Sequence, residues 1–239
     1  PDLADQGVIE ITHLIEQVAD SDDIAAIAVA APGPIDRDKG ILLPTPNMTW
    51  GKVALIQQLR NHFHTPIVLE KDANAAALSE ATLGAARDHK YVLYVTVSTG
   101  IGTGIVLEGE IYHGAHDPEG GHMRIAAEGV SEELETAASG RALKRRYGKY
   151  VYQITDPKIW DEFAEDLAIG LHNLITTISP DIVVLGGGVG VHFHKFERFL
   201  RAHLEQLEPL YPIPPIVPAK NMETAVAYGT LILASRLHS

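Results

Sequence analysis

Acidic side chains that could act as a base lie at the end of one short expected strand. Glu70-Lys71-Asp72-Ala73-Asn74 follows the apolar residues Ile67 to Leu69. A carboxylate in this position can accept the proton of a hydroxyl group as its oxygen attacks a phosphoryl group. Asp72 is therefore our candidate base, although an aspartate before a helix is also a common N-cap.

A second group of polar residues has the chemistry of a sugar site. Glu119-Gly120-Gly121-His122 is followed by Glu135 thirteen residues after the histidine. Carboxylates and imidazoles bind sugar hydroxyl groups well, so Glu119, His122 and Glu135 could form a polyol site. The same groups could bind a metal ion, but the chain has no cysteine and no second well-spaced histidine here. We expect no dedicated metal ion.

Two glycine-rich segments could bind phosphate groups. In the segment Ser98 to Gly104, glycines let backbone N–H groups approach an anion, and Thr99 adds a hydroxyl donor. A glycine-rich hairpin is the alternative interpretation. Gly186-Gly187-Gly188 comes directly after a buried strand, where nucleotides often bind, but a plain strand-to-helix turn would look the same.

A basic cluster ends one expected helix. Cations at the end of a helix complement its dipole, so we interpret this cluster as a solvated face without function. It consists of Arg141, Lys144, Arg145, Arg146 and Lys149.

Composition limits the classes of function. The 239 residues include 31 acidic and 19 basic side chains, a formal charge of −12, and no cysteine. Such a charge opposes binding to nucleic acid phosphates, so no nucleic acid partner is expected. The lack of cysteine fits a reducing compartment, and we expect the cytoplasm. No apolar run approaches the roughly 20 residues that cross a bilayer, so no membrane partner is expected.

The first part of the chain has the pattern of alternating helices and strands. Apolar residues at steps of three and four predict a helix over 8–18, and a continuous apolar run predicts a buried strand over 24–31. A loop follows to residue 49. We then expect a helix over 53–63, a strand over 67–70 and an alanine-rich helix over 73–86.

From Tyr91 the pattern changes to a β-meander that is followed by helices. We expect a domain boundary near 87–90, with an N-terminal lobe over 1–89, a C-terminal lobe over 90–223 and a last helix that packs back on the first lobe. The expected strands are 91–98, 105–107, 111–112 and 182–185, and the expected helices are 132–147, 159–179, 193–207 and 224–237, with a proline-rich link over 209–218.

The two halves look like copies of one unit. The second half reads βββαβα, whereas the first reads αβα without an opening meander. A sheet without its central strands would leave buried backbone groups unpaired. We therefore expect that the natural polypeptide begins earlier, or that another segment supplies those strands.

Several of these segments resemble motifs of the ROK family, which groups bacterial sugar kinases with sugar-responsive repressors. The resemblance implies that Asn47 binds the sugar, that Asp72 is the base, and that Glu119, His122 and Glu135 contact the sugar. It also implies nucleotide contacts at Thr99, Gly100, Gly102 and Gly186 to Gly188. The matching segments are Pro32 to Asp36, Pro46 to Trp50, Asp72 to Asn74, Thr99 to Gly102, Glu119 to His122 and Gly186 to Gly188.

The sequence departs from the family pattern in three places. Lys71 stands where an asparagine usually precedes the base. The segment from Met123 to Glu133 has no cysteine where the family often carries a zinc cluster, so we expect no structural zinc. The first phosphate motif, an Asp-x-Gly-x-Thr hairpin, is not present in the printed sequence, so the chain as given could be inactive.

The resemblance implies a duplicated α/β fold of the actin-like ATPase, ribonuclease-H-like type, with the first half lacking its opening meander. It implies an ATP-dependent kinase that uses Mg²⁺, phosphorylates a hexose or related sugar, and forms a homodimer. The alternative from another class is the sugar-sensing domain of a repressor or an inactive kinase homologue. A repressor would need a helix-turn-helix ahead of Pro1, outside the printed sequence.

Overall fold

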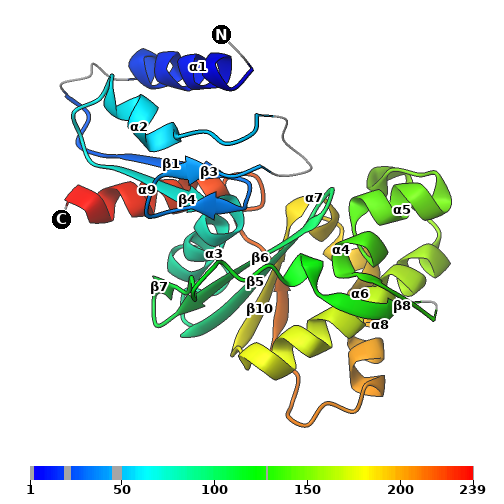
Figure 1. Cartoon of the computed structure of the whole chain (residues 1–239). Coiled ribbons are helices and arrows are strands. Elements are labelled where there is room, and N and C mark those ends of the chain that lie inside the picture. The colour runs from blue at the N-terminus through cyan, green and yellow to red at the C-terminus, as the bar shows by residue number, and fades with distance from the viewer. Residues whose placement is uncertain (1–2, 19–22, 45–49, 128, 239) are drawn as a thin grey trace. The chain divides into compact units, whose positions relative to one another are not determined.

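The computed structural model describes residues 3–18, 23–44, 50–127 and 129–238. It divides into two compact units (Figure 1). Unit 1 contains Pro1–Ala76 and Val226–Ser239, and unit 2 contains Ala77–Ala225. The division falls inside helix α3 (Asp72–Thr82).

Unit 1 is built on a parallel pair of strands. β1 (Ile27–Ala31) pairs with β4 (Ile67–Lys71) in a register that sets Ile27 opposite Ile67. Helix α1 (Leu3–Val18) buries Ala4, Val8 and Thr12 at four-residue steps, which is the period of one helix face. The unit also contains β2 (Ile35–Asp36), β3 (Ile41–Leu42), α2 (Leu55–Arg60) and α9 (Ala225–His238).

Helix α9 packs closely on the start of α3. A Cβ atom added to Gly229 would lie only 1.9 Å from the carbonyl oxygen of Ala75. The absence of a side chain at Gly229 therefore permits this close approach of two helix backbones. In this way the end of the chain becomes part of the unit that contains its beginning.

Unit 2 is a five-stranded mixed sheet with helices. The strand order is β11-β10-β5-β6-β7, in which β5 pairs with β6 in the antiparallel sense and with β10 in the parallel sense. The central strands β5 and β10 are almost wholly buried and consist of apolar runs, as expected of strands covered on both faces. The strands are β5 (Tyr91–Val97), β6 (Ile101–Leu107), β7 (Glu110–Ile111), β10 (Ile182–Gly186) and β11 (Ile216–Pro218).

Two long helices supply much of the core of unit 2. α6 (Pro157–Ile178) and α8 (Phe193–Gln206) lie side by side (Figure 1). Their contact includes the rings of Trp160, Phe163 and Phe196, which stack or meet edge-on at centroid distances of 5.2 to 5.9 Å. Such aromatic pairs add to the stability gained from apolar burial.

The expected helix over 132–147 is wrong. The structure has strand β9 (Val130–Glu133), then the short α4 (Leu134–Ala137), then α5 (Gly140–Tyr147). The break has a local cause, because Ser139 has extended backbone and its hydroxyl accepts the Ala142 N–H at 3.2 Å as the N-cap of α5. Strand β9 pairs with β8 (Arg124–Ala127) in a hairpin that we did not predict.

Other differences concern short elements. β6 begins at Ile101, so the glycines at 102 and 104 lie within a strand and only residues 98–100 form the turn. The expected loop over 36–49 begins with the small β2–β3 hairpin, and the proline-rich link ends in β11. Of the helices among the described residues, none has both the length and the apolar character needed to cross a membrane.

Candidate functional site

A cavity of about 410 Å³ in unit 2 is lined by two of the predicted nucleotide-binding residues, Thr99 and Gly188. Three chain segments form it: the turn between β5 and β6, the start of α5, and the first residues of α7 (Gly187–Gly190). Tyrosines from the segment after α5 complete the wall. The described lining residues are Ser98, Thr99, Gly140, Arg141, Lys144, Tyr150, Val151, Tyr152, Gly188 and Val189.

Backbone hydrogen bonds join the β5–β6 turn to α5. The Gly140 N–H donates to the carbonyl of Ser98 at 2.7 Å, and the Arg141 N–H donates to that of Thr99 at 3.3 Å. A Cβ atom at Gly140 would lie 2.7 Å from the Ser98 oxygen, so glycine allows the contact. The turn and the helix start therefore form one connected wall of the cavity.

The three predicted glycines after β10 have different surroundings. Gly186 is the last residue of β10, paired with Thr96. Gly187 has φ +79, and a Cβ atom there would lie 2.5 Å from the Val97 carbonyl oxygen. Gly188 faces open space, with the Ser98 hydroxyl as its nearest neighbour at 4.0 Å, and it lines the cavity.

Two members of the basic cluster, the exposed Arg141 and Lys144, line the cavity. The Lys144 ammonium lies 3.9 Å from the ring centroid of Tyr150, which stacks on Tyr152 at 5.8 Å with an interplanar angle of 3°. Sequence reasoning missed the two tyrosines. The alternation of Lys149, Tyr150 and Tyr152 with apolar Val151 was the available signal, since cations and aromatic rings together suit a charged aromatic ligand.

Gly102 lies inside β6, opposite Thr96, and is not among the residues that line the cavity. Gly100, in the turn before it, packs against Glu135: an added Cβ atom would lie 2.4 Å from Glu135 Oε2. The same carboxylate oxygen accepts the Ile101 N–H at 3.3 Å. Predicted sugar and nucleotide residues thus meet at the β5–β6 turn.

Close backbone packing also places Glu119 and His122. Glu119 comes directly before the 3₁₀ turn η2 (Gly120–His122), and His122 is its last residue. This turn lies against β6. The Gly120 N–H donates to the Thr103 hydroxyl at 3.0 Å, and a Cβ atom at Gly121 would lie 2.0 Å from the Ile101 carbonyl oxygen. The two glycines of the motif are therefore required for η2 to pack on the strand that also contacts Glu135.

His122 lies among acidic side chains. Its Nδ1 is 3.1 Å from Oε2 of Glu133. This hydrogen bond raises the pKa of His122 above its usual value. The negative charges of Glu133, Glu135 and Glu119 act in the same direction, whereas partial burial acts against it. The ligand atoms of His122, Glu133 and Glu135 lie within 4.8 Å of one another, close enough to hold a cation. Contacts within the chain also account for this grouping, so the expectation of no dedicated metal stays a prediction.

In unit 1, Asp72 is the first residue of α3 and directly follows β4. Its side chain is half-buried, and Oδ1 accepts the Ala73 N–H at 2.7 Å. An N-cap accepts an N–H two or three residues further on, so this contact with the next residue is not the usual N-cap bond, but it holds the carboxylate beside the end of the strand. Lys71, which replaces the usual asparagine, is buried.

A buried carboxylate that we did not predict organises the β4–α3 junction. Oε1 of Glu70, whose side chain is 2% exposed, accepts hydrogen bonds from Arg37 Nη2 at 2.6 Å, from the Lys71 N–H at 2.7 Å and from Asn74 Nδ2 at 2.9 Å. A buried charge with an ionic partner and further donors holds its neighbours strongly. The signal in the sequence was an acidic residue directly after the apolar Val68 and Leu69. Asn47 lies outside the described residues.

Comparison with known proteins gives the chain a family. The sequence profile of the ROK family matches residues 4–237, nearly the whole chain. The chain belongs to the ROK family. The resemblance predicted from the motifs is thereby confirmed.

Individual ROK proteins similar to this chain include enzymes and regulators. It is 30% identical over 217 residues to a glucokinase of Thermotoga maritima, which covers 75% of this chain and 68% of the glucokinase. It is 30% identical over 213 residues to the xylose repressor of Bacillus subtilis, covering 79% of this chain and 55% of the repressor. The chain therefore spans only about half the length of that repressor.

A solved structure confirms the expected fold of this ROK chain. The ROK hexokinase of Thermus thermophilus superposes with a TM-score of 0.77 and 29% identity, covering 95% of this chain and 86% of that one. The actin-like ATPase type of α/β fold is therefore correct.

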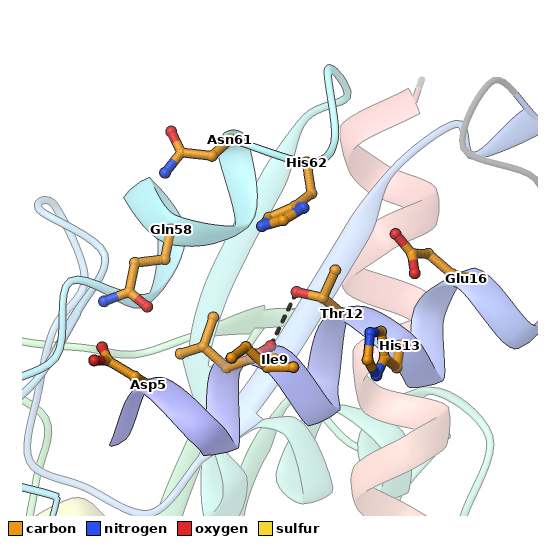
Figure 2. A pocket seen from close by; sticks show the side chains of 9 residues that line it. Asp5, Ile9, Thr12, His13, Glu16, Gln58, Asn61 and His62 are labelled. Atoms are coloured by element: carbon orange, nitrogen blue, oxygen red, sulfur yellow. Dashed lines mark hydrogen bonds between the residues drawn. The ribbon is translucent and has the colours of Figure 1, made fainter. Parts of the chain in front are cut away.

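Unit 1 contains a separate cavity of about 370 Å³ between α1 and α2. Figure 2 shows polar side chains from both helices around it, including Asp5, His13 and Glu16 of α1 and Gln58 of α2. The Thr12 hydroxyl, which lines it, donates to the Val8 carbonyl at 2.9 Å. None of the described lining residues is a predicted site residue.

Proposed function

We propose that this chain acts as an ATP-dependent sugar kinase, which transfers a phosphoryl group to a hydroxyl group of a hexose or related sugar. One observation carries the proposal. The β5–β6 turn lines the cavity of unit 2 through Ser98 and Thr99, and its next two residues contact the predicted sugar ligand Glu135. A single turn thus borders both a nucleotide-sized cavity and a carboxylate suited to a sugar.

The cavity has groups for each part of a nucleotide. Arg141 and Lys144 supply positive charge for phosphate groups, Ser98 and Thr99 supply hydroxyl donors, and Tyr150 with Tyr152 supplies aromatic surface for a base. Thr99, Gly100, Gly102 and the glycines at 186–188 keep their proposed nucleotide role. No described lining residue is a carboxylate, so Mg²⁺ would enter with the phosphates of ATP, whose oxygens are ligands that it prefers.

The acceptor sugar would be oriented by Asn47, Glu119, His122 and Glu135. As the sugar oxygen forms its bond to the γ-phosphorus, the bond from that phosphorus to the bridging oxygen of ADP breaks, and Asp72 accepts the hydroxyl proton. Catalysis of this type depends mainly on position and on neutralised charge. The half-buried position of Asp72 beside the Glu70 network supports a fixed carboxylate.

The setting of the reaction is also part of the proposal. The formal charge of −12 supports a chain without a nucleic acid partner, and the lack of cysteine supports the cytoplasm. The family resemblance supports a homodimer. Sedimentation of the purified chain tests that last point.

The Asp72→Asn variant tests the chemistry. We expect ATP consumption with the best of a panel of hexoses to fall by roughly a hundredfold or more, because the proton acceptor is lost. Sugar affinity should stay near that of the wild type. Asp88→Asn is the matched control, since Asp88 is exposed and pairs with Arg87 on the surface. An Asp72→Asn variant with ordinary turnover would remove Asp72 from the mechanism.

A second function is supported by the similarity to the xylose repressor, because its sequence identity to this chain, 30%, is the same as that of the glucokinase. In this case the same site would bind a sugar as a signal and not phosphorylate it. A sugar that raises the melting temperature while ATP has no effect would favour the sensor. Sugar-dependent consumption of ATP would favour the kinase.

A further inference from the structure

Glu133 lies outside every motif of the proposed site, but it contacts one of the proposed sugar ligands. We infer that Glu133 is a positioning residue for sugar binding: its carboxylate binds the Nδ1 side of His122 and leaves the Nε2 side for a sugar hydroxyl group. The contact that carries this inference is the 3.1 Å distance between His122 Nδ1 and Glu133 Oε2. The inference rests on the proposed function and assigns it a residue that the motifs do not contain.

The β8–β9 hairpin delivers Glu133 to the histidine. Glu133 stands opposite Arg124 in the antiparallel ladder, and the Leu134 N–H donates to the Met123 carbonyl at 2.9 Å. His122, the last residue of η2, comes directly before Met123 and Arg124, the two residues that pair with the end of β9. Closing the hairpin therefore places the end of β9 beside the end of η2.

The register of the hairpin selects Glu133 and not its neighbour. Arg124 Nε donates to the Ser131 hydroxyl at 3.2 Å, and its Nη2 donates to the Ser131 carbonyl. These side-chain hydrogen bonds support the same strand register as the backbone pairing of β8 with β9. Successive side chains of a strand point to opposite faces, and Glu132 accordingly pairs with Arg145 at 3.4 Å. A slip of one residue would exchange the two glutamates.

The hydrogen bond at one ring nitrogen of a histidine determines what the other nitrogen offers. Because Glu133 binds Nδ1, Nε2 is the ring nitrogen left for a sugar, and the three carboxylates near the ring, Glu133, Glu135 and Glu119, raise the pKa of His122. Ionised carboxylates only accept hydrogen bonds, whereas an imidazolium donates. In its protonated form, His122 would therefore donate to the oxygen of a hydroxyl group whose proton a carboxylate accepts.

The experiment compares two neighbouring glutamates in the full chain. Calorimetry measures the affinity for the tightest-binding sugar among glucose, fructose, mannose and xylose. We expect Glu133→Ala to weaken binding roughly tenfold, as loss of a hydrogen bond between charged groups would do. Glu133→Gln, which keeps an acceptor, should lose less, and Glu132→Ala, the matched control on the opposite face, should bind as the wild type does. Affinity for ATP should not change in any of them.

A double-mutant cycle distinguishes positioning from a direct or general structural effect. If Glu133 acts through His122, Glu133→Ala should have no further effect on sugar affinity in a His122→Ala background. The ¹⁵N chemical shifts of the His122 ring, which need no sugar, should change in Glu133→Ala and not in Glu132→Ala.

Specific results would overturn the inference. They are unchanged sugar affinity in Glu133→Ala, equal losses in Glu132→Ala, or additive losses in the double variant. These results leave the proposed function intact if the wild-type chain binds a sugar and ATP. A wild-type chain that binds no sugar would instead overturn the proposed function, and with it the role of Glu133.

Discussion

Two adjacent glycines after β10 differ in what a side chain would meet. Gly187 has φ +79, and its Cβ atom would lie 2.5 Å from a backbone oxygen, whereas a Cβ atom on Gly188 would enter open space. We expect Gly187→Ala to lower the free energy of unfolding by roughly 2 kcal/mol, because alanine is strained in the left-handed region and the backbone must move. Chemical denaturation measures this change.

Gly188→Ala is the control for that substitution. Its stability should equal that of the wild type, and any loss should appear in nucleotide affinity, because Gly188 lines the cavity. Equal stability of both variants would contradict our account of the turn after β10.

Individual site residues were predicted unevenly from the sequence. Thr99 and Gly188 were predicted as nucleotide contacts, and both line the cavity. They could be found because glycine content and a position directly after a strand are local signals in the sequence. Four other lining residues were not predicted: Arg141, Lys144, Tyr150 and Tyr152. They line one cavity only because α5 and the segment after it fold beside the β5–β6 turn. Glu133 was hidden for a similar reason, since its role depends on strand register.

Among the elements, the end of α3 is joined to residues 220–221 by one buried glutamate. Glu80 of α3 is fully buried, and its carboxylate accepts N–H groups of Ala85 at 2.7 Å, Lys220 at 3.0 Å and Asn221 at 2.7 Å. One side chain thus fixes both the end of α3 and the segment that leads to α9.

We expect Glu80→Gln to lower the free energy of unfolding by roughly 3 kcal/mol, because the amide turns an N–H₂ group toward buried N–H donors that then lose their acceptor. Thermal and urea unfolding measure the change. Glu223→Ala serves as the control, since Glu223 is exposed a few residues from the same segment. A Glu80→Gln variant as stable as the control would show that this carboxylate is not what anchors residues 220–221.

Elements with strong periodicity were predicted well, and those set by distant partners were not. The apolar stripe of α6 and the buried runs of β5 and β10 are signals contained in the segment itself. The single helix that we expected over 132–147 is a strand followed by two helices. The strand was missed because β9 is held by its pairing with β8. The extent of β6 was missed since its glycines resemble a loop, although pairing with β5 holds them in a strand.

For the molecule as a whole, the motif order sufficed to identify the ROK family and its α/β fold, which the comparisons confirm. The organisation of the cavity could not be derived in the same way. Its wall joins residues 98–99, 140–141, 144, 150–152 and 188–189, which are separated by up to 91 positions in the sequence (189 − 98). No spacing rule within a segment predicts which of these side chains face one another.

In the proposed kinase, the cavity of unit 2 holds the phosphoryl donor. Hydrogen exchange of the chain with and without a non-hydrolysable ATP analogue and Mg²⁺ tests it most directly. We predict slower exchange at residues 98–101, 139–144 and 187–190, with no change in α1 and α2, which line the cavity of about 370 Å³ in unit 1. Protection confined to α1 and α2, or no protection at saturating nucleotide, would contradict the claim.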